Sequence, residues 1–221
     1  MEGYNVKGSH STKVGGVIKQ MLKIHQNDPT AKILVFSTWV DVLNVLATAL
    51  TENNINYRTL YHGVKFQQNL TAFREDKDVL ALLLPIQSGS NGLNLIEATY
   101  VLLVEPILNP AQELQAIGRV HRIGQTKKTE VHRFLVRGTI EQKMYLMLKT
   151  LESSPSSHDT EENSLTIGDL TSLLSEESRD QDQVEDALEV ESQNEQETAR
   201  PNISVEQDEN LNLDNDSLLI P

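Results

Sequence analysis

The chain of 221 residues has no cysteine, and only 5% of its residues are aromatic. Without cysteine, neither a disulfide nor a zinc–thiolate site can form within this chain, which fits a reducing compartment. The longest apolar runs, 79–86 and 100–104, are too short to span a membrane. The first residues contain no apolar stretch typical of a signal peptide. We therefore expect no membrane partner.

A second absence concerns nucleotide binding. A glycine-rich loop that ends in Lys-Ser or Lys-Thr would cradle the phosphates of a nucleotide, and the sequence contains none. The pair Gly15-Gly16 is not followed by the required lysine. We therefore do not expect this chain to hold a phosphate chain by itself.

Acidic residues are concentrated in the last third of the chain. Residues 1–150 carry 17 Lys and Arg against 12 Asp and Glu, a net +5, whereas residues 151–221 carry 2 against 20, a net −18. The globular part is therefore mildly basic, although the whole chain has a net charge of −13. Composition predicts an acidic, largely disordered tail over 152–221, with a short helix near 165–176. Such a tail either keeps the protein soluble or competes with DNA for the basic part.

Helical and strand patterns alternate along the globular part. Apolar residues at helical spacing after Ser11 predict a helix to Asn27, within an N-terminal segment 1–30. Continuously apolar runs predict buried strands over 32–37, 57–61, 79–84, 100–104 and 131–136. Helices are expected over 41–52, 66–73, 92–96, 110 to 119 or beyond, and 139–151. The pattern predicts an α/β domain over 31–151, with a parallel sheet flanked by helices.

The position of a ligand follows from that fold. Parallel sheets bind ligands beyond the carboxyl ends of their strands. The loops after Leu84 and Val104, and the stretch before Val131, are therefore expected to gather at that edge.

The string QAIGRVHRIGQ, residues 115–125, carries most of the chemistry. Gln115, Arg119 and Arg122 follow one another at spacings of four and three, which would place them on one face of a helix end. Two guanidinium groups on one face suit a phosphate chain that gains charge as it is cleaved. Gly118 would keep the backbone open to close approach. A solvated basic helix end would explain the single residues, but the whole string favours the phosphate-binding interpretation.

This string resembles motif six of the superfamily-two helicases, in the form typical of Swi/Snf-type ATPases. The segments KILVFSTWVD (32–41), SGSNGLNL (88–95) and VEPILNP (104–110) resemble motif four, motif five and the link between motifs five and six. Residues 131–142 resemble the closing strand and helix of the family. The resemblance covers most of residues 12–150 and implies the second, C-terminal RecA-like lobe of such an ATPase.

The resemblance also implies roles for single residues. Arg119 and Arg122 are arginine fingers for ATP, which is held with magnesium on the first RecA-like lobe. Gln115 and Gly118 belong to the same nucleotide-binding motif, and Gly92 and Asn94 join the nucleotide cleft to the DNA track. The candidates for contact with a DNA strand are Ser37, Thr38, Trp39 and Ser88.

A basic stretch beside motif six is less specific. It contains Lys127, Lys128, Arg133 and Arg137, for which a DNA-backbone contact and a solvated surface remain equally open. For Trp39, packing in the core at the strand-to-helix turn is favoured over stacking on a base.

The sequences of these motifs resemble in particular those of family members that join the ATPase to a RING ubiquitin-ligase module. This implies a larger nuclear protein, a translocase on double-stranded DNA that acts in DNA damage tolerance. Its further partners would be a ubiquitin-conjugating enzyme and a replication clamp. The chain alone, without the phosphate-binding lobe and the RING, is expected to be inactive.

Some positions depart from the family pattern. Pro85-Ile86 stand where the family has Ser-Thr, and Tyr61-His62-Gly63 where it has Leu-Asp-Gly. Two alternatives stay open. One is a DEAD-box-like RNA helicase lobe, which would want arginine at the positions of Gln125 and Lys128. The other is a non-catalytic interaction module that retains the fold.

Overall fold

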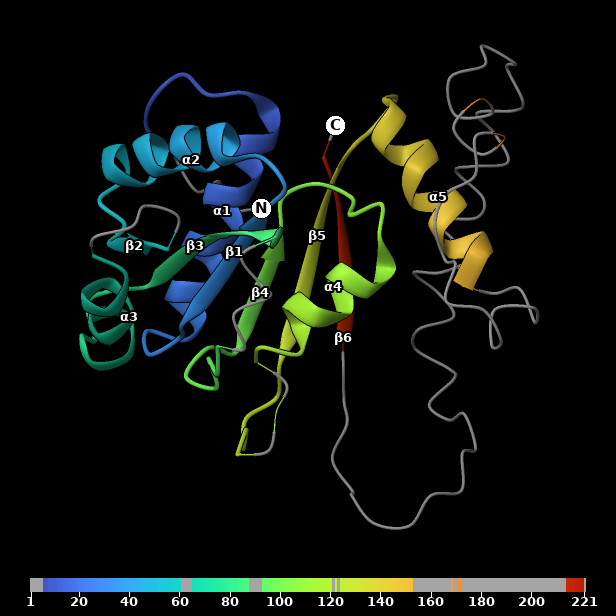
Figure 1. Cartoon of the computed structure of the whole chain (residues 1–221). Helices are drawn as coiled ribbons and strands as arrows, with labels where there is room; N and C mark the ends of the chain where they lie inside the picture. Colours follow the sequence, from blue (N-terminus) through green and yellow to red (C-terminus); the bar gives the residue numbers. More distant parts are fainter. Residues whose placement is uncertain are drawn as a thin grey trace. The chain divides into compact units, whose positions relative to one another are not determined.

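The computed structural model describes residues 6–60, 65–87, 93–120, 122, 124–152, 168 and 171, and the backbone of 214–220. Residues 1–165 and 212–221 belong to one compact unit and residues 166–211 to a second. The first unit contains the α/β domain that the sequence predicts, with helices on both faces of a parallel sheet (Figure 1).

The sheet is parallel throughout, and its strand order is β2-β3-β1-β4-β5-β6. The strands are β1 Ile33–Ser37, β2 Tyr57–Thr59, β3 Ala81–Pro85, β4 Tyr100–Leu103, β5 Glu130–Val136 and β6 Asp214–Ile220. Every residue of β1 and β3 is buried. The central strands are covered on both faces, which explains why their sequences are continuously apolar.

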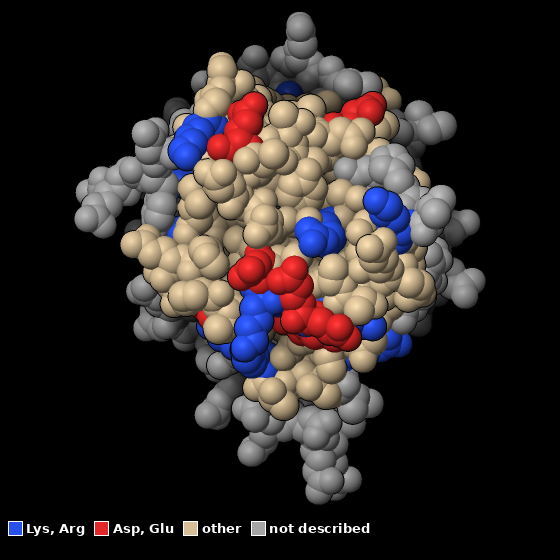
Figure 2. Space-filling view, turned by 90° about the vertical axis from the view of Figure 1, so that its left-hand side faces the viewer, with Lys and Arg blue, Asp and Glu red and all other residues tan. Residues whose placement is uncertain are grey.

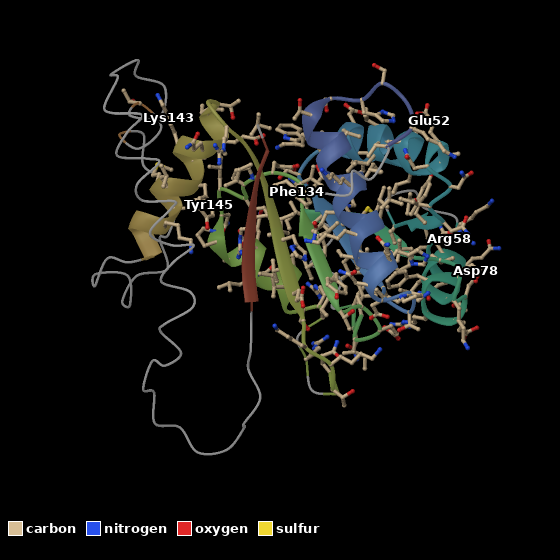
Figure 3. The ribbon with its side chains drawn as sticks, turned by 180° about the vertical axis from the view of Figure 1, so that it is seen from behind. Glu52, Arg58, Asp78, Phe134, Lys143 and Tyr145 are labelled. Carbon is tan, nitrogen blue, oxygen red and sulfur yellow. The ribbon has the colours of Figure 1, made fainter. Side chains whose placement is uncertain are left out.

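Each face of the sheet carries its own apolar cluster. Ile33 and Val35 pack with α1 (Thr12–Asn27) and α2 (Val40–Glu52). The alternate residues of β1 pack on the opposite face with α3 (Phe66–Glu75) and α4 (Pro110–Ile117). Figure 3, which is seen from behind, shows α1 across the back of the sheet and Phe134 of β5 beside it, in the same apolar cluster. The last helix, α5 (Ile140–Glu152), packs against β5.

The starts of two helices confirm the sequence signals. Ser11 is the N-cap of α1, where its Oγ accepts a hydrogen bond from the backbone N–H of Val14 at 3.4 Å. In α4, Pro110 occupies the first turn. Asn109, a cap that the sequence analysis did not single out, accepts a hydrogen bond from the backbone of Ala111 at 3.0 Å.

Two predictions about helices were wrong, one for the end of the helix in motif six and one for a short helix in motif five. The helix α4 ends at Ile117, with Gly118 as its C-cap, and does not reach Arg119. Glycine inside a helix costs backbone entropy, which favours an end at this position. No helix forms over 93–96, and Gly92 lies outside the described residues. The backbone N–H of Leu95 instead donates to the carbonyl of Arg119 at 3.0 Å, so this segment pairs with motif six rather than with itself.

One strand comes from the tail and was not predicted. The strand β6 pairs with β5 at seven positions, from Glu130↔Asp214 to Val136↔Ile220. It ends in Leu-Leu-Ile, the one strongly apolar run near the end of the chain. Of the helix predicted near 165–176, Gly168 and Thr171 are helical and the other residues lie outside the described part. None of the helices described is both long enough and apolar enough to cross a bilayer.

Candidate functional site

The predicted site residues lie at two opposite edges of the sheet. The strands are parallel, so all their amino ends lie at one edge, called the amino edge here, and all their carboxyl ends lie at the carboxyl edge. Ser37 to Trp39 follow β1 and lie at the carboxyl edge, as do the residues after Val104. Motif six leads into β5 and therefore lies at the amino edge, where the N–H of Glu130 donates to Thr99 O at 2.9 Å. The prediction that the stretch before Val131 reaches the carboxyl edge was wrong, because a segment that enters a parallel strand must meet its amino end.

At the amino edge, motif six leaves the helix before its arginines. Gln115 is exposed on the last turn of α4, whereas Arg119 lies in the turn after Gly118 and Arg122 lies three residues further on. The prediction that Gln115, Arg119 and Arg122 share one helical face is therefore wrong. The two arginines are nevertheless close enough for their charges to affect one another.

The electrostatics of Arg119 set it apart from an ordinary surface arginine. Burial lowers the pKa of its guanidinium below the usual value, and the positive charge of Arg122 lowers it further. Its Nε is buried and has no hydrogen-bond partner among the residues that the structure describes. Buried donors in proteins are normally satisfied, and an exception needs an explanation. An anion bound at this place would supply both the missing acceptor and the opposing charge.

Gln125, the last residue of the motif-six string, joins motif six to the residues after motif five. Its Nε2 donates to the carbonyls of Ile96 at 2.9 Å and Ala98 at 3.0 Å. Its Oε1 accepts a hydrogen bond from the backbone N–H of Lys127 at 3.0 Å. Both its donor and its acceptor are used, so Gln125 fixes the position of the loop that carries Asn94 relative to the arginines.

Asn94 is held from the other side by a residue that the sequence analysis did not select. Its carbonyl accepts a hydrogen bond from Arg74 of α3 at 2.6 Å, and Arg74 also pairs with Glu97 at 3.2 Å. Twenty residues separate Arg74 from Asn94, and neither spacing nor motif connects them in the sequence. The structure thus brings Asn94, Gly118 and Arg119 into one region, while Gly92 lies outside the described residues.

At the carboxyl edge, Ser37 is buried and Trp39 is exposed. Ser37 is 2% exposed, and its Oγ donates to Glu105 Oε1 at 2.8 Å. The backbone N–H of Thr38 donates to the same carboxylate oxygen. Trp39 is 65% exposed, so the prediction that it packs in the core was wrong. The bonds to Glu105 turn the chain outward directly after β1, and Ser88 lies outside the described residues.

The basic residues near motif six do not form one group. Lys127 and Lys128 are exposed at the amino edge. Arg133 is mostly buried and its Nε donates to Glu113 Oε1 at 2.8 Å, so this residue is committed to the fold. Arg137 is exposed at the carboxyl edge, after β5.

A pocket of about 670 Å³ opens at the amino edge, and two cations in its lining, Lys32 and Arg74, already have partners. The ammonium of Lys32 donates to the carbonyl of Val79 at 2.7 Å, and Arg74 pairs with Glu97. On the side formed by α2, β2 and α3, Figure 2 shows acidic and basic side chains intermixed. Arg58 of β2 pairs with Asp76, the C-cap of α3, at 3.9 Å. Within the described residues, no group of acidic or histidine side chains could hold a metal ion. Because the described residues of the α2, β2 and α3 side carry charges of both signs, this side differs from a nucleic-acid surface, which typically carries positive charge alone.

Comparisons with known proteins agree on one family. Residues 16–124 match the family described as the helicase conserved C-terminal domain. The E3 ubiquitin-protein ligase SHPRH of Homo sapiens is 56% identical over 182 residues, which is 81% of this chain and 11% of that protein. The DNA repair protein RAD5A of Arabidopsis thaliana is 35% identical over 137 residues, which is 61% of this chain and 13% of that protein.

A solved structure shows the same architecture. The C-terminal part of the Fun30 ATPase domain matches with a TM-score of 0.59 and 25% identity, over 86% of this chain and 57% of that chain. Against the two curated relatives, by contrast, this chain spans little more than a tenth of their length.

Proposed function

This chain carries the C-terminal lobe of a Swi/Snf-type superfamily-two helicase, similar to SHPRH, and from that premise we propose that it supplies the arginine fingers of a DNA-dependent ATPase. In this proposal Arg119 and Arg122 reach the phosphates of ATP, which the first RecA-like lobe holds together with magnesium. Gln115 and Gly118 complete this part of the nucleotide site.

The observation that carries the proposal is the state of Arg119. Its Nε is buried without an acceptor in the described part of the chain, and its guanidinium is partly desolvated beside a second positive charge. This arrangement is unfavourable in the isolated lobe and becomes favourable when an anion binds. A phosphoryl group that gains negative charge during transfer is the anion that such donors stabilise best.

The DNA track is assigned to the carboxyl edge, with Thr38 and Trp39 as contacts. Ser88 stays a candidate of the proposal, whereas Ser37 acts by holding its neighbours, because its hydroxyl is buried and bound to Glu105. The segment from 86 to 99 runs from the carboxyl end of β3 to the amino end of β4. It therefore connects the proposed DNA contacts with Asn94 and the nucleotide side. Lys127 and Lys128, at the amino edge, would bind phosphates of a second stretch of nucleic acid.

The parent protein is proposed from the relatives. SHPRH is named an E3 ubiquitin-protein ligase and RAD5A a DNA repair protein. We assign this chain to a nuclear translocase of that kind, which combines ATP-driven movement on double-stranded DNA with RING-dependent ubiquitin transfer. A ubiquitin-conjugating enzyme and a replication clamp would bind parts of the parent outside this chain.

The test joins this chain to a first RecA-like lobe and measures ATP hydrolysis with and without duplex DNA. We expect background hydrolysis from the chain alone and DNA-stimulated hydrolysis from the joined protein. Arg119→Ala or Arg122→Ala should lower kcat by about 10³- to 10⁵-fold, the range that arginine fingers contribute. The control is Arg137→Ala, which removes an exposed arginine at the opposite edge. At saturating DNA, the kcat of this variant should equal that of the wild-type joined protein.

Three results would count against the proposal. Hydrolysis by the chain alone that disappears in Arg119→Ala would show that no second lobe is needed. An unchanged kcat in Arg119→Ala would refute the finger assignment. Stimulation by RNA but not by DNA would assign the lobe to an RNA helicase instead.

A further inference from the structure

We propose that Glu105 is a positioning residue for DNA binding, and that it holds Trp39 in place to pack against the backbone of one DNA strand. The inference rests on the proposed DNA track at the carboxyl edge. It adds a residue, Glu105, that neither contacts the nucleotide side nor belongs to the exposed surface.

The geometry shows how one carboxylate organises this edge. The strands β1 and β4 are neighbours, with Phe36 in register with Leu103. Glu105 follows β4, and its two oxygens lie 2.8 and 3.1 Å from the Oγ of Ser37. The backbone N–H of Thr38 donates to the same carboxylate. Glu105 therefore ties the end of β4 to the end of β1, through Ser37 and Thr38, which are 68 and 67 residues away in the sequence.

The same network fixes the backbone of Trp39. Its N–H donates to the Oγ of Ser37 at 3.1 Å, so two hydrogen bonds, through Ser37, link the tryptophan to the carboxylate. Its side chain nevertheless stays 65% exposed. A rigid backbone that presents a large, solvent-exposed side chain is a favourable starting point for binding, because little conformational entropy remains to be lost.

The chemistry of the indole selects the ligand. Its ring is apolar and its Nε1–H donates hydrogen bonds. A DNA strand offers apolar deoxyribose next to phosphate oxygens, which matches both properties without reading sequence. Val40 and Leu108, which are 36% and 39% exposed, are further apolar side chains at this edge. A free carboxylate would repel phosphates, but that of Glu105 is turned toward Ser37 and Thr38, which fits positioning rather than contact.

The experiment uses Trp39 as its own reporter, because it is the single tryptophan of the chain. The full chain is titrated with a short duplex DNA at low salt, and both the Trp39 emission and the anisotropy of labelled DNA are recorded. We expect DNA to change the emission of the wild-type protein. Trp39→Ala should weaken binding about 5- to 100-fold, the range for the loss of one aromatic contact with nucleic acid. Glu105→Ala and Glu105→Gln should weaken binding less, and Glu105→Asp should restore part of the loss.

A double-mutant cycle separates positioning from general damage. If Glu105 acts through Trp39, then Glu105→Ala should add no further loss in a protein that already carries Trp39→Ala. The matched control is Glu113→Ala, which removes another largely buried glutamate, 18% exposed and paired with Arg133. This control should lower thermal stability and leave DNA affinity unchanged.

Each remaining outcome overturns part of the reasoning. If the wild-type chain does not bind DNA, the proposed DNA track fails and the inference fails with it. If the wild type binds DNA without any change in Trp39 emission, or if the two substitutions are additive, only the inference fails. If a joined first lobe shields Trp39 from iodide quenching in the absence of DNA, this surface is a lobe interface and the inference is wrong.

Discussion

Replacing Arg119 by methionine should make the isolated chain more stable. In the folded protein the Nε of Arg119 is buried and finds no hydrogen-bond partner among the described residues, whereas water satisfies it in the unfolded chain. Methionine replaces the arginine stem as far as the position of Nε, stays apolar, and brings no donor. The same substitution removes the repulsion between Arg119 and Arg122. Both changes favour the folded state.

The size of this effect follows from the cost of an unsatisfied group. A buried donor without a partner costs roughly 1–3 kcal/mol. Arg119 is only partly buried, so we expect a gain near the lower limit, about 1 kcal/mol. For a domain of about 150 residues, this corresponds to a rise in Tm of about 2–4 °C.

The matched control is the same substitution at Arg133. That guanidinium is 16% exposed and its Nε donates to Glu113 Oε1 at 2.8 Å. Arg133→Met leaves the carboxylate of Glu113 without its partner, and breaking a buried pair costs up to about 3–5 kcal/mol. The two arginines should therefore respond with opposite signs.

Thermal and urea unfolding of the full chain, followed by circular dichroism, measure both changes. A clear loss of stability in Arg119→Met would refute the reasoning, because it would show that Arg119 supports the fold. In the protein joined to a first lobe, the same variant should lose DNA-stimulated ATP hydrolysis. Higher stability together with lost activity is the signature of a residue kept for function.

Three further predictions concern other parts of the domain. Phe73→Ala removes a fully buried ring and should lower the free energy of unfolding by about 3–5 kcal/mol in urea, and a loss below about 1 kcal/mol would contradict the described packing. Gln125→Ala leaves the carbonyls of Ile96 and Ala98 without their shared donor and should cost about 1–3 kcal/mol, with faster amide exchange at Ile96 as the local readout. Burial lowers the pKa of Lys32 below 10.5, so the unfolded chain holds its proton more tightly, and stability should rise as the pH increases toward 10.5. Lys32→Met should lack this rise, and an equal slope in both proteins would refute it.

The sequence predicted the fold well because its strands are buried on both faces. Runs such as 33–37 and 81–85 are apolar at nearly every position, which marks central strands of a parallel sheet. Ser11 and Pro110 likewise act locally, and the helix starts that they predict are correct. The strand β6 was missed because its seven residues are half polar and gain their partner only from the distant β5.

The site was predicted less completely, because the contacts that shape it are not local. The role of the two arginines of motif six stays a prediction. The predicted shared face was wrong because the spacing rule assumed a helix through Arg119, whereas α4 ends at Ile117. Glu105 and Arg74 act through partners that are 67 and 20 residues away, and no periodicity relates them. Trp39 was expected in the core because large aromatic residues usually pack there. The hydrogen bonds of Ser37 and Thr38 to Glu105 instead turn the chain outward at Trp39.

The sixth strand also decides how the acidic tail should be studied. With β6 in place, the hydrogen-bonding groups of β5 are paired along seven residues. A protein shortened before residue 214 would lose β6, and β5 would become the edge strand of the sheet. An exposed edge strand can pair with other copies of the chain and promote aggregation. Removing the tail would therefore change association as well as charge. Replacing Asp and Glu between 153 and 213 by Asn and Gln lowers the charge of the tail, while β6 continues to pair with β5.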